Sequence, residues 1–262
     1  MKKYKLGRLP ARPLNKKQRA YAGTLMAHLD PLGTPPDKSD WTPAVVAAVQ
    51  GDWKMDGNDK VGCCTCADCS HQVMLWTANA GSIIIPTEQD TLALYSAITG
   101  YDPNAPLDAD GNNPTDTGAN MDDVCAYLKN TGYLGVKLDS YAPISKSNFA
   151  HIKWGIQLFG SVKIGVNLPD NAQTQFEKGE PWDIGWLPIQ PIEGGHDVCL
   201  VGYDADYFYC VTWHKIQAIT PRWLAKYLEE VFCPLSPEWI SATGSAPSGF
   251  DMPALQKDMG EI

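Results

Sequence analysis

Apolar residues recur at helical spacing in the first half of the chain, whereas in the second half they alternate with polar residues as in strands. Thr87, with Asp90 three residues later, is typical of the capped start of a helix. Helices are predicted over residues 15–28, 64–80, 87–99, 121–130 and 146–159, strands over 161–168, 198–203, 207–212 and 215–219, and a last helix over about 220–231. This order predicts an α+β protein, with a helical lobe at about 58–160 and an antiparallel β lobe at about 161–240.

The two ends of the chain differ in composition from the body. Residues 1–39 are basic and rich in proline and form a predicted extension that packs on the body, and it is too short to resemble a large inhibitory pro-segment. The body is predicted at 40–240, and a flexible tail rich in Ser, Gly, Pro and Ala at 241–262. No apolar run reaches membrane-spanning length and no signal-peptide core is seen, so a cytoplasmic or otherwise intracellular protein without a membrane partner is expected.

Charge is distributed unevenly along the 262 residues, whose net charge is −9. The first nineteen residues hold eight of the 21 Lys and Arg residues and no acid, so the rest of the chain has 13 basic residues against 30 acidic ones and a net charge of −17. The acidic remainder argues against a nucleic-acid-binding body. Nucleic acid is therefore an unlikely partner except through the arm 1–19, and the simpler expectation is that the arm lies on the protein's own acidic surface.

Four of the eight cysteines are crowded together at Cys63, Cys64, Cys66 and Cys69, too closely for four long-range disulfides. Reduced thiols are therefore expected. Cys64 stands at the predicted start of a helix, where the macrodipole and free backbone N–H groups lower the pKa of a thiol. The remaining cysteines are interpreted as small buried apolar residues, namely Cys69, Cys125, Cys199, Cys210 and Cys233.

Metal binding is a separate hypothesis for this cluster. Cys63, Cys64, Cys66 and Cys69, with His71 nearby, could bind Zn²⁺ or Cu⁺. However, structural zinc sites usually pair two ligand couples across a longer loop, and adjacent cysteines cannot easily face one tetrahedral ion. The acidic stretch 108–116 does not complete a calcium loop, because Asn113 stands where glycine is needed and Ala119 where glutamate is needed. No metal or cofactor is therefore expected.

Several short segments together resemble the papain-like cysteine peptidases. Asp40-Trp41 is similar to the start of the mature enzyme in that family, and Asn58-Asp59-Lys60-Val61-Gly62-Cys63-Cys64 to the segment that ends in the nucleophile. Phe159-Gly160-Ser161-Val162 resembles the beginning of the β lobe, and Gly195-His196-Asp197-Val198 through Val201-Gly202-Tyr203 resembles the histidine strand. The resemblance covers about 40–240 in order and spacing and implies a two-lobe papain-like fold with the site between the lobes.

The resemblance also implies a role for four residues. Cys64 would be the nucleophile and His196 the general acid and base. Asn58, six residues before Cys64, would donate to the oxyanion together with the Cys64 backbone N–H, although the family has a Gln at this position. Thr212 takes the place of the Asn that orients the histidine. Cys63 and Cys66 are alternative nucleophiles, but Cys64 fits both the Asn58 spacing and the helix start.

The strand end at 212–214 departs from the family more than the cysteine segment does. If the alignment with the family shifted by one residue, Trp213 rather than Thr212 would face the site, since neighbours in a strand face opposite sides. The third catalytic residue, which orients the histidine, would then be missing. His214 stands where the family has a shielding aromatic residue. The sequence thus predicts a papain-like cysteine hydrolase of peptide or isopeptide bonds in an unidentified peptide or protein substrate. The alternatives are a non-catalytic papain-fold scaffold with a degraded triad and a thiol-based metal-binding protein.

Overall fold

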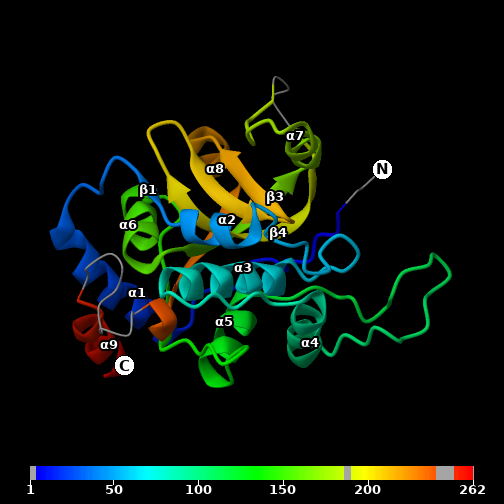
Figure 1. Ribbon diagram of the computed structural model, residues 1–262, viewed down its shortest axis with the longest axis horizontal. Helices are drawn as coiled ribbons and strands as arrows, with labels where there is room; N and C mark the ends of the chain where they lie inside the picture. Colours follow the sequence, from blue (N-terminus) through cyan, green and yellow to red (C-terminus); the bar gives the residue numbers. More distant parts are fainter. Residues whose placement is uncertain (1–3, 186–189, 240–250, 262) are drawn as a thin grey trace.

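The computed structural model describes residues 4–185, 190–239 and 251–261. Helices dominate the first half of the chain and one antiparallel sheet dominates the second half, which confirms the α+β class (Figure 1). None of the described helices is long and apolar enough to cross a membrane.

The central helix of the structure is α3, which is buried at every position from Cys64 to Thr77. Its neighbour α4 begins with the predicted capping box, in which Thr87 and Asp90 satisfy each other's backbone N–H groups. Helix α6 begins later than predicted, because Asn148 rather than Ser145 caps it. The helices of the described chain are α1 Lys16–Leu29, η1 Asp30–Leu32, α2 Pro43–Val49, α3 Cys64–Asn79, α4 Glu88–Thr99, α5 Met121–Asn130, α6 Phe149–Phe159, α7 Ala172–Lys178, α8 Pro221–Tyr227, η2 Pro237–Trp239 and α9 Met252–Gly260.

The sheet has the strand order β2-β7-β3-β4-β5-β6, with the short β1 paired to β4. Its central strand β4 is buried along its second half, where it packs against α3. In β4, His196 lies opposite Val166 of β3, and the following residue Asp197 lies opposite Gly165. The strands are β1 Ser39–Asp40, β2 Ser140–Pro143, β3 Val162–Pro169, β4 Ile192–Tyr203, β5 Phe208–Thr212, β6 Lys215–Ile219 and β7 Leu228–Leu235.

Three predicted elements differ from the structure. The helix expected to reach Val231 ends at Tyr227, and residues 228–235 form β7 between β2 and β3. Strand β4 begins at Ile192, six residues before its predicted start. The tail predicted to be flexible contains α9, whose Leu255 and Met259 are buried and which contacts α1. The rest of that predicted tail, residues 240–250 and 262, lies outside the described residues.

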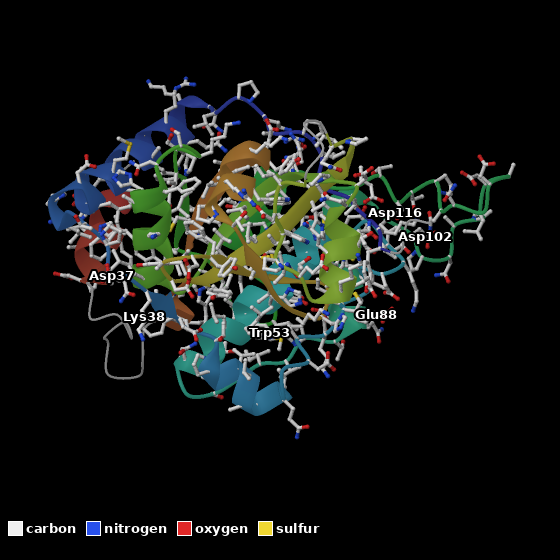
Figure 2. All side chains as sticks on the ribbon, turned by 90° about the horizontal axis from the view of Figure 1, so that it is seen from above. Asp37, Lys38, Trp53, Glu88, Asp102 and Asp116 are labelled. Carbon is white, nitrogen blue, oxygen red and sulfur yellow. The ribbon has the colours of Figure 1, made fainter. Side chains whose placement is uncertain are left out.

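The acidic loop 101–119 has no helix, as predicted, and extends away from the body beyond α4 (Figures 1 and 2). Asp102 lies on the extended part and Asp116 at its base. Both oxygens of Asp116 accept hydrogen bonds from the backbone N–H of Gly62, at 3.1 and 3.0 Å. The loop therefore fixes the peptide that leads into α3.

Candidate active site

Cys64 opens α3 and is 1% exposed. Burial raises the pKa of its thiol to about 12, and the nearby Asp197 carboxylate acts in the same direction. The backbone N–H groups of Gly7 and Asp197 favour the thiolate, but their effect is smaller. The predicted lowering of the thiol pKa by the helix start is therefore wrong for this state, because desolvation of the charged form outweighs the helix dipole.

His196 is held by two consecutive residues at the end of β5. Its Nε2 lies 2.8 Å from the hydroxyl oxygen of Thr212, and its ring stacks on Trp213 with centroids 5.1 Å apart. Among the described residues, Nδ1 of His196 has no hydrogen-bond partner. Trp213 reaches the same histidine because its backbone has a left-handed φ of 51°, which ends the strand alternation at Thr212.

The sequence presented Thr212 and Trp213 as alternatives, and the structure places both of them against the imidazole. The aromatic ring that lies against the imidazole of His196 is thus that of Trp213, and His214 packs edge-on against Phe176 instead. Nothing in the sequence marks a non-glycine residue for a left-handed backbone. The strand register alone would have put the two side chains on opposite faces.

The imidazole of His196 is 1% exposed, and burial lowers its pKa to about 3. The positive guanidinium of Arg8 is the next cause, because it disfavours a second cation nearby, and His71 adds to it. At neutral pH both Cys64 and His196 are therefore uncharged in this state. A thiolate–imidazolium pair requires a more hydrated site.

Asn58 does not face open space. Its amide nitrogen donates to the carbonyl oxygens of Val61, at 3.1 Å, and of Lys5, at 3.3 Å. Both amide N–H groups are thus occupied by backbone carbonyls in this state. The Lys5 carbonyl belongs to the N-terminal arm, so one of the two bonds depends on the position of that arm.

Residues 4–9, which we call the strap, run across the site in an extended conformation. The Arg8 N–H donates to the Gly195 carbonyl at 3.1 Å, and the Gly7 carbonyl accepts from Ala119 N–H at 2.8 Å. Gly7 lies so close to Gly62 that a Cβ at Gly7 would be 1.7 Å from the Gly62 carbonyl oxygen. The strap is therefore a backbone-paired segment that only glycine allows to pass beside Cys64.

The beginning of the strap is anchored on the histidine side. Tyr4 stacks on Trp213 with ring centroids 4.4 Å apart, and its N–H donates to the side-chain oxygen of Gln173 at 3.0 Å. Its hydroxyl donates to Glu177 of α7. Residues 4–9 of the predicted extension thus pack through the site, whereas Arg12 lies on the acidic exterior, where it pairs with Asp123 at 2.7 Å.

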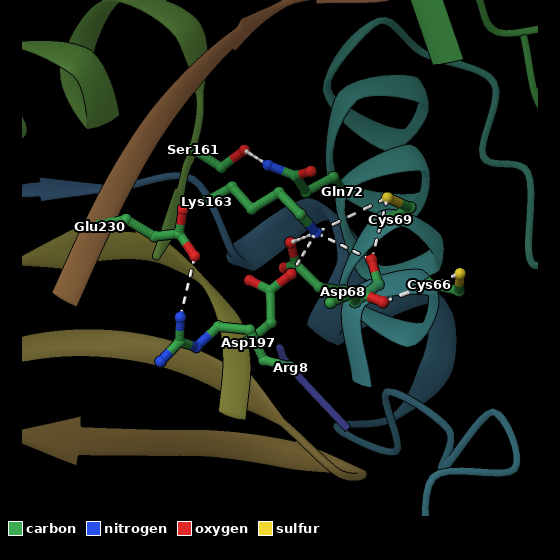
Figure 3. A network of polar contacts seen from close by, with 10 residues as sticks. Arg8, Cys66, Asp68, Cys69, Gln72, Ser161, Lys163, Asp197 and Glu230 are labelled. Atoms are coloured by element: carbon green, nitrogen blue, oxygen red, sulfur yellow. Dashed lines mark hydrogen bonds and ion pairs between the residues drawn. The ribbon is translucent and has the colours of Figure 1, made fainter. Parts of the chain in front are cut away.

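A buried cation joins the helix of Cys64 to the strand of His196 (Figure 3). The Lys163 ammonium on β3 lies 2.5 Å from Asp68 of α3 and 2.7 Å from Asp197 of β4, and all three side chains are at most 1% exposed. Sequence reasoning missed this ion triad. The available signal was a lysine inside an apolar strand, which is rarely buried unless it is paired.

The other thiols are separate from one another. The Cys63 thiol donates to the Asp56 carbonyl, and the Cys69 thiol donates to the Thr65 carbonyl. All eight cysteines are free and buried. Within the described part of the chain, no group of three or more His, Cys, Asp or Glu side chains is arranged to hold a metal ion, which gives the metal-binding hypothesis no support.

A groove of about 530 Å³ follows the strap. Three acidic residues line it beside the strap, namely Asp59, Asp116 and Glu193. A slightly larger cavity of about 640 Å³ lies elsewhere, next to Trp41 and Tyr203. We place the candidate site at the first groove, because it adjoins Gly195, the neighbour of His196.

No protein-family model and no curated protein matches the sequence. Among solved structures, xylellain, a cysteine protease from Xylella fastidiosa, superposes with a TM-score of 0.60 at 15% sequence identity, over 89% of this chain and 97% of that chain. Digestive procathepsin L 3 of the Tenebrio molitor larval midgut superposes with a TM-score of 0.54 at 14% identity, over 89% of this chain and 76% of that chain. At these identities the likeness is one of fold.

Proposed function

We propose that this chain, whose fold is the papain-like fold of cysteine proteases, is a cysteine hydrolase of peptide or isopeptide bonds that is held here in a closed state. The observation that supports it best is the environment of His196. A buried imidazole is oriented by Thr212 through Nε2 and by Trp213 through its face, and Nδ1 is left without a partner among the described residues. This nitrogen is therefore available to accept a proton.

The chemistry follows from the two side chains. With Nε2–H donating to Thr212, Nδ1 carries the lone pair and can take the proton of the Cys64 thiol. The sulfur then attacks the carbonyl carbon of the substrate, and the electron pair of the carbonyl moves to oxygen. The oxyanion then collapses, the C–N bond breaks, and His196 gives its proton to the leaving amine, which leaves a thioester on Cys64. Water attacks the thioester carbonyl as the imidazole takes one of its protons, the C–S bond breaks, and the imidazolium returns this proton to the Cys64 sulfur.

The oxyanion donors in this proposal are the Cys64 backbone N–H and one N–H of Asn58. The Asn58 N–H now donates to the carbonyl of Lys5 in the strap, so it becomes available when the strap leaves. Water that enters with the strap displaced also reduces the desolvation that holds the thiol pKa at about 12. The strap therefore controls both the access to the site and its protonation states.

The filled site is also the observation that favours the second candidate, a non-catalytic scaffold with the papain fold. In that case the strap is a permanent part of the core, and Cys64 and His196 are packing residues. The two candidates differ in what happens when the strap is displaced.

Gly7→Ala in the full chain separates them, because the added Cβ would collide with the Gly62 carbonyl. We expect this variant to hydrolyse a panel of fluorogenic peptide amides, and Cys64→Ala in the same background to lose that activity. Gly23→Ala is the matched control, since nothing lies within 4 Å of the added atom in α1, and it should behave like the wild type. A folded Gly7→Ala variant without turnover on any peptide would favour the scaffold.

A further inference from the structure

The deepest side chain of the strap is that of Arg8, which is 1% exposed. Its guanidinium lies 2.9 Å from a carboxylate oxygen of Glu230 on β7 and 3.0 Å from the side-chain oxygen of Asn167 on β3. It also donates to the carbonyl of Leu9 at 3.1 Å. A basic residue from a segment that is held next to it by backbone bonds, and at its beginning by Tyr4, thus occupies a polar pocket in the sheet (Figure 3).

The sheet is shaped for this side chain. Gly165 of β3 lies opposite Glu230 in the sheet, and the register shifts between Gly165 and Val166. A Cβ at Gly165 would be 2.6 Å from the Arg8 side chain and 2.9 Å from that of Glu230. The glycine therefore makes the space that the arginine stem fills, and Glu230 supplies the charge at its end.

The backbone contacts of the strap carry no sequence information. Arg8 pairs with Gly195 and Gly7 pairs with Ala119 through main-chain groups that any extended peptide offers. In this mode of recognition main-chain hydrogen bonds supply affinity and side-chain pockets supply specificity. A peptide that lies along the groove as the strap does would place one side chain in the Arg8 pocket.

We propose that the pocket formed by Gly165, Asn167 and Glu230 is a specificity pocket for arginine, and that the groove selects polypeptides with a glycine beside Cys64 followed by an arginine. The strap is then a tethered copy of such a sequence. The inference rests on the proposed function, because it takes the groove to be the substrate site. Glu230 is the residue that determines the preference.

Binding tests the pocket without requiring turnover. The protein is the full chain carrying Gly7→Ala, and the probe is a fluorescent peptide with the sequence of residues 4–10. Its analogue carries citrulline, which keeps the shape of arginine but not the charge, in place of Arg8. We expect the citrulline peptide to bind at least about 30-fold more weakly, since a buried carboxylate then loses its partner.

Glu230→Gln in the same background should reduce this difference to less than about threefold. Glu229→Gln is the matched control, because Glu229 accepts from Asn167 and forms no ion pair with Arg8, and it should preserve the preference. A second opened form is needed in case the Gly7 variant misfolds. It is the full chain with a site-specific protease sequence inserted after Pro13, which is cut after purification to release the strap. Its thermal unfolding is then measured to check that the cut protein is folded.

Equal binding of the two peptides, an undiminished preference in Glu230→Gln, or no peptide binding by either folded, opened form would overturn the proposal. These outcomes are separate from failure of the proposed function. If the opened protein prefers the arginine peptide but never hydrolyses a peptide, the specificity pocket is supported and the hydrolase function is contradicted. If it hydrolyses peptides without preferring arginine, the hydrolase function is supported and the pocket is contradicted.

Discussion

The two sides of the candidate site are built from different ranges of the sequence. On the histidine side, Thr212 and Trp213 are consecutive residues at the end of β5, and β5 pairs directly with the strand that carries His196. On the cysteine side, the state of Cys64 depends on burial and on Gly7 of the strap, which comes from the N-terminal arm and not from α3. The orientation of a base can thus be fixed by local structure, whereas the reactivity of a thiol depends on what covers it.

This difference reverses the ranking of the two sides that is expected from the sequence. The cysteine segment resembled an enzyme more closely, yet in the structure its thiol is protonated and its Asn58 amide is bound to backbone carbonyls. The strand end, which departed more from the family, holds the histidine by a hydrogen bond and a ring stack. Experiments that disturb one side and leave the other intact therefore test whether the two sides are controlled separately.

The reactivity of Cys64 should change the most. Gly7→Ala should raise its rate of alkylation by iodoacetamide at neutral pH by about two to three orders of magnitude, because the thiol pKa returns from about 12 towards its ordinary range. The rate is measured by mass spectrometry of the peptide that contains Cys64. Cys125, which is buried in the wild type, serves as the internal reference, and Gly23→Ala as the matched variant. Labelling of Cys64 no faster than that of Cys125 would contradict the strap's role.

The next effect concerns the ion triad that holds the two sides together. Lys163→Met leaves Asp68 and Asp197 buried without their cation, so it should lower the free energy of unfolding by about 3–5 kcal/mol. Urea unfolding measures it. Lys60→Met is the control, since that side chain is 72% exposed and its change should stay within about 0.5 kcal/mol. An equal effect in both variants would mean that the triad does not hold helix and strand together.

The smallest effect is a pH dependence on the histidine side. The folded pKa of His196 is about 3 against an ordinary 6.5, so between these values the unfolded chain binds a proton that the folded chain does not. The free energy of unfolding should therefore fall as the pH is lowered from 6.5 towards 3, by up to about 1.4 kcal/mol per pH unit from this residue. Urea titrations at about pH 7 and about pH 4.5 should show a shallower slope for His196→Gln than for the wild type. Parallel slopes would contradict the buried, neutral imidazole.

Local signals explain which elements could be predicted. The start of α4 could be predicted because its capping box, Thr87 with Asp90, lies within four consecutive residues. Strand β7 was missed because Leu228, Glu229 and Glu230 are favourable in helices and only the pairing with β2 and β3 makes them a strand. The β class of the second half was evident, but the strand that completes the arginine pocket was not.

The residues of the site could be predicted from the sequence, but their burial and protonation states could not. The spacing of Cys64, His196 and Thr212 placed them in one fold, and the structure brings His196 and Thr212 together. The strap lies within the arm 1–19, which the sequence predicts to rest on the protein's own acidic surface, because charge runs are usually solvated. Its burial depends on glycines at 7 and 62 and on Gly165, which give no indication in sequence of what they lie against.

The pairing of Arg8 with Glu230 also sets an order of events during synthesis. The two residues are 222 positions apart, so the strap leaves the ribosome long before β7 exists. Until that strand has formed, the groove has no complete pocket for Arg8, and closing so long a loop comes late in folding. Helix α3 can therefore form in the nascent protein before Arg8 has its partner, and the strap makes its last ion pair only on a chain that has folded through β7.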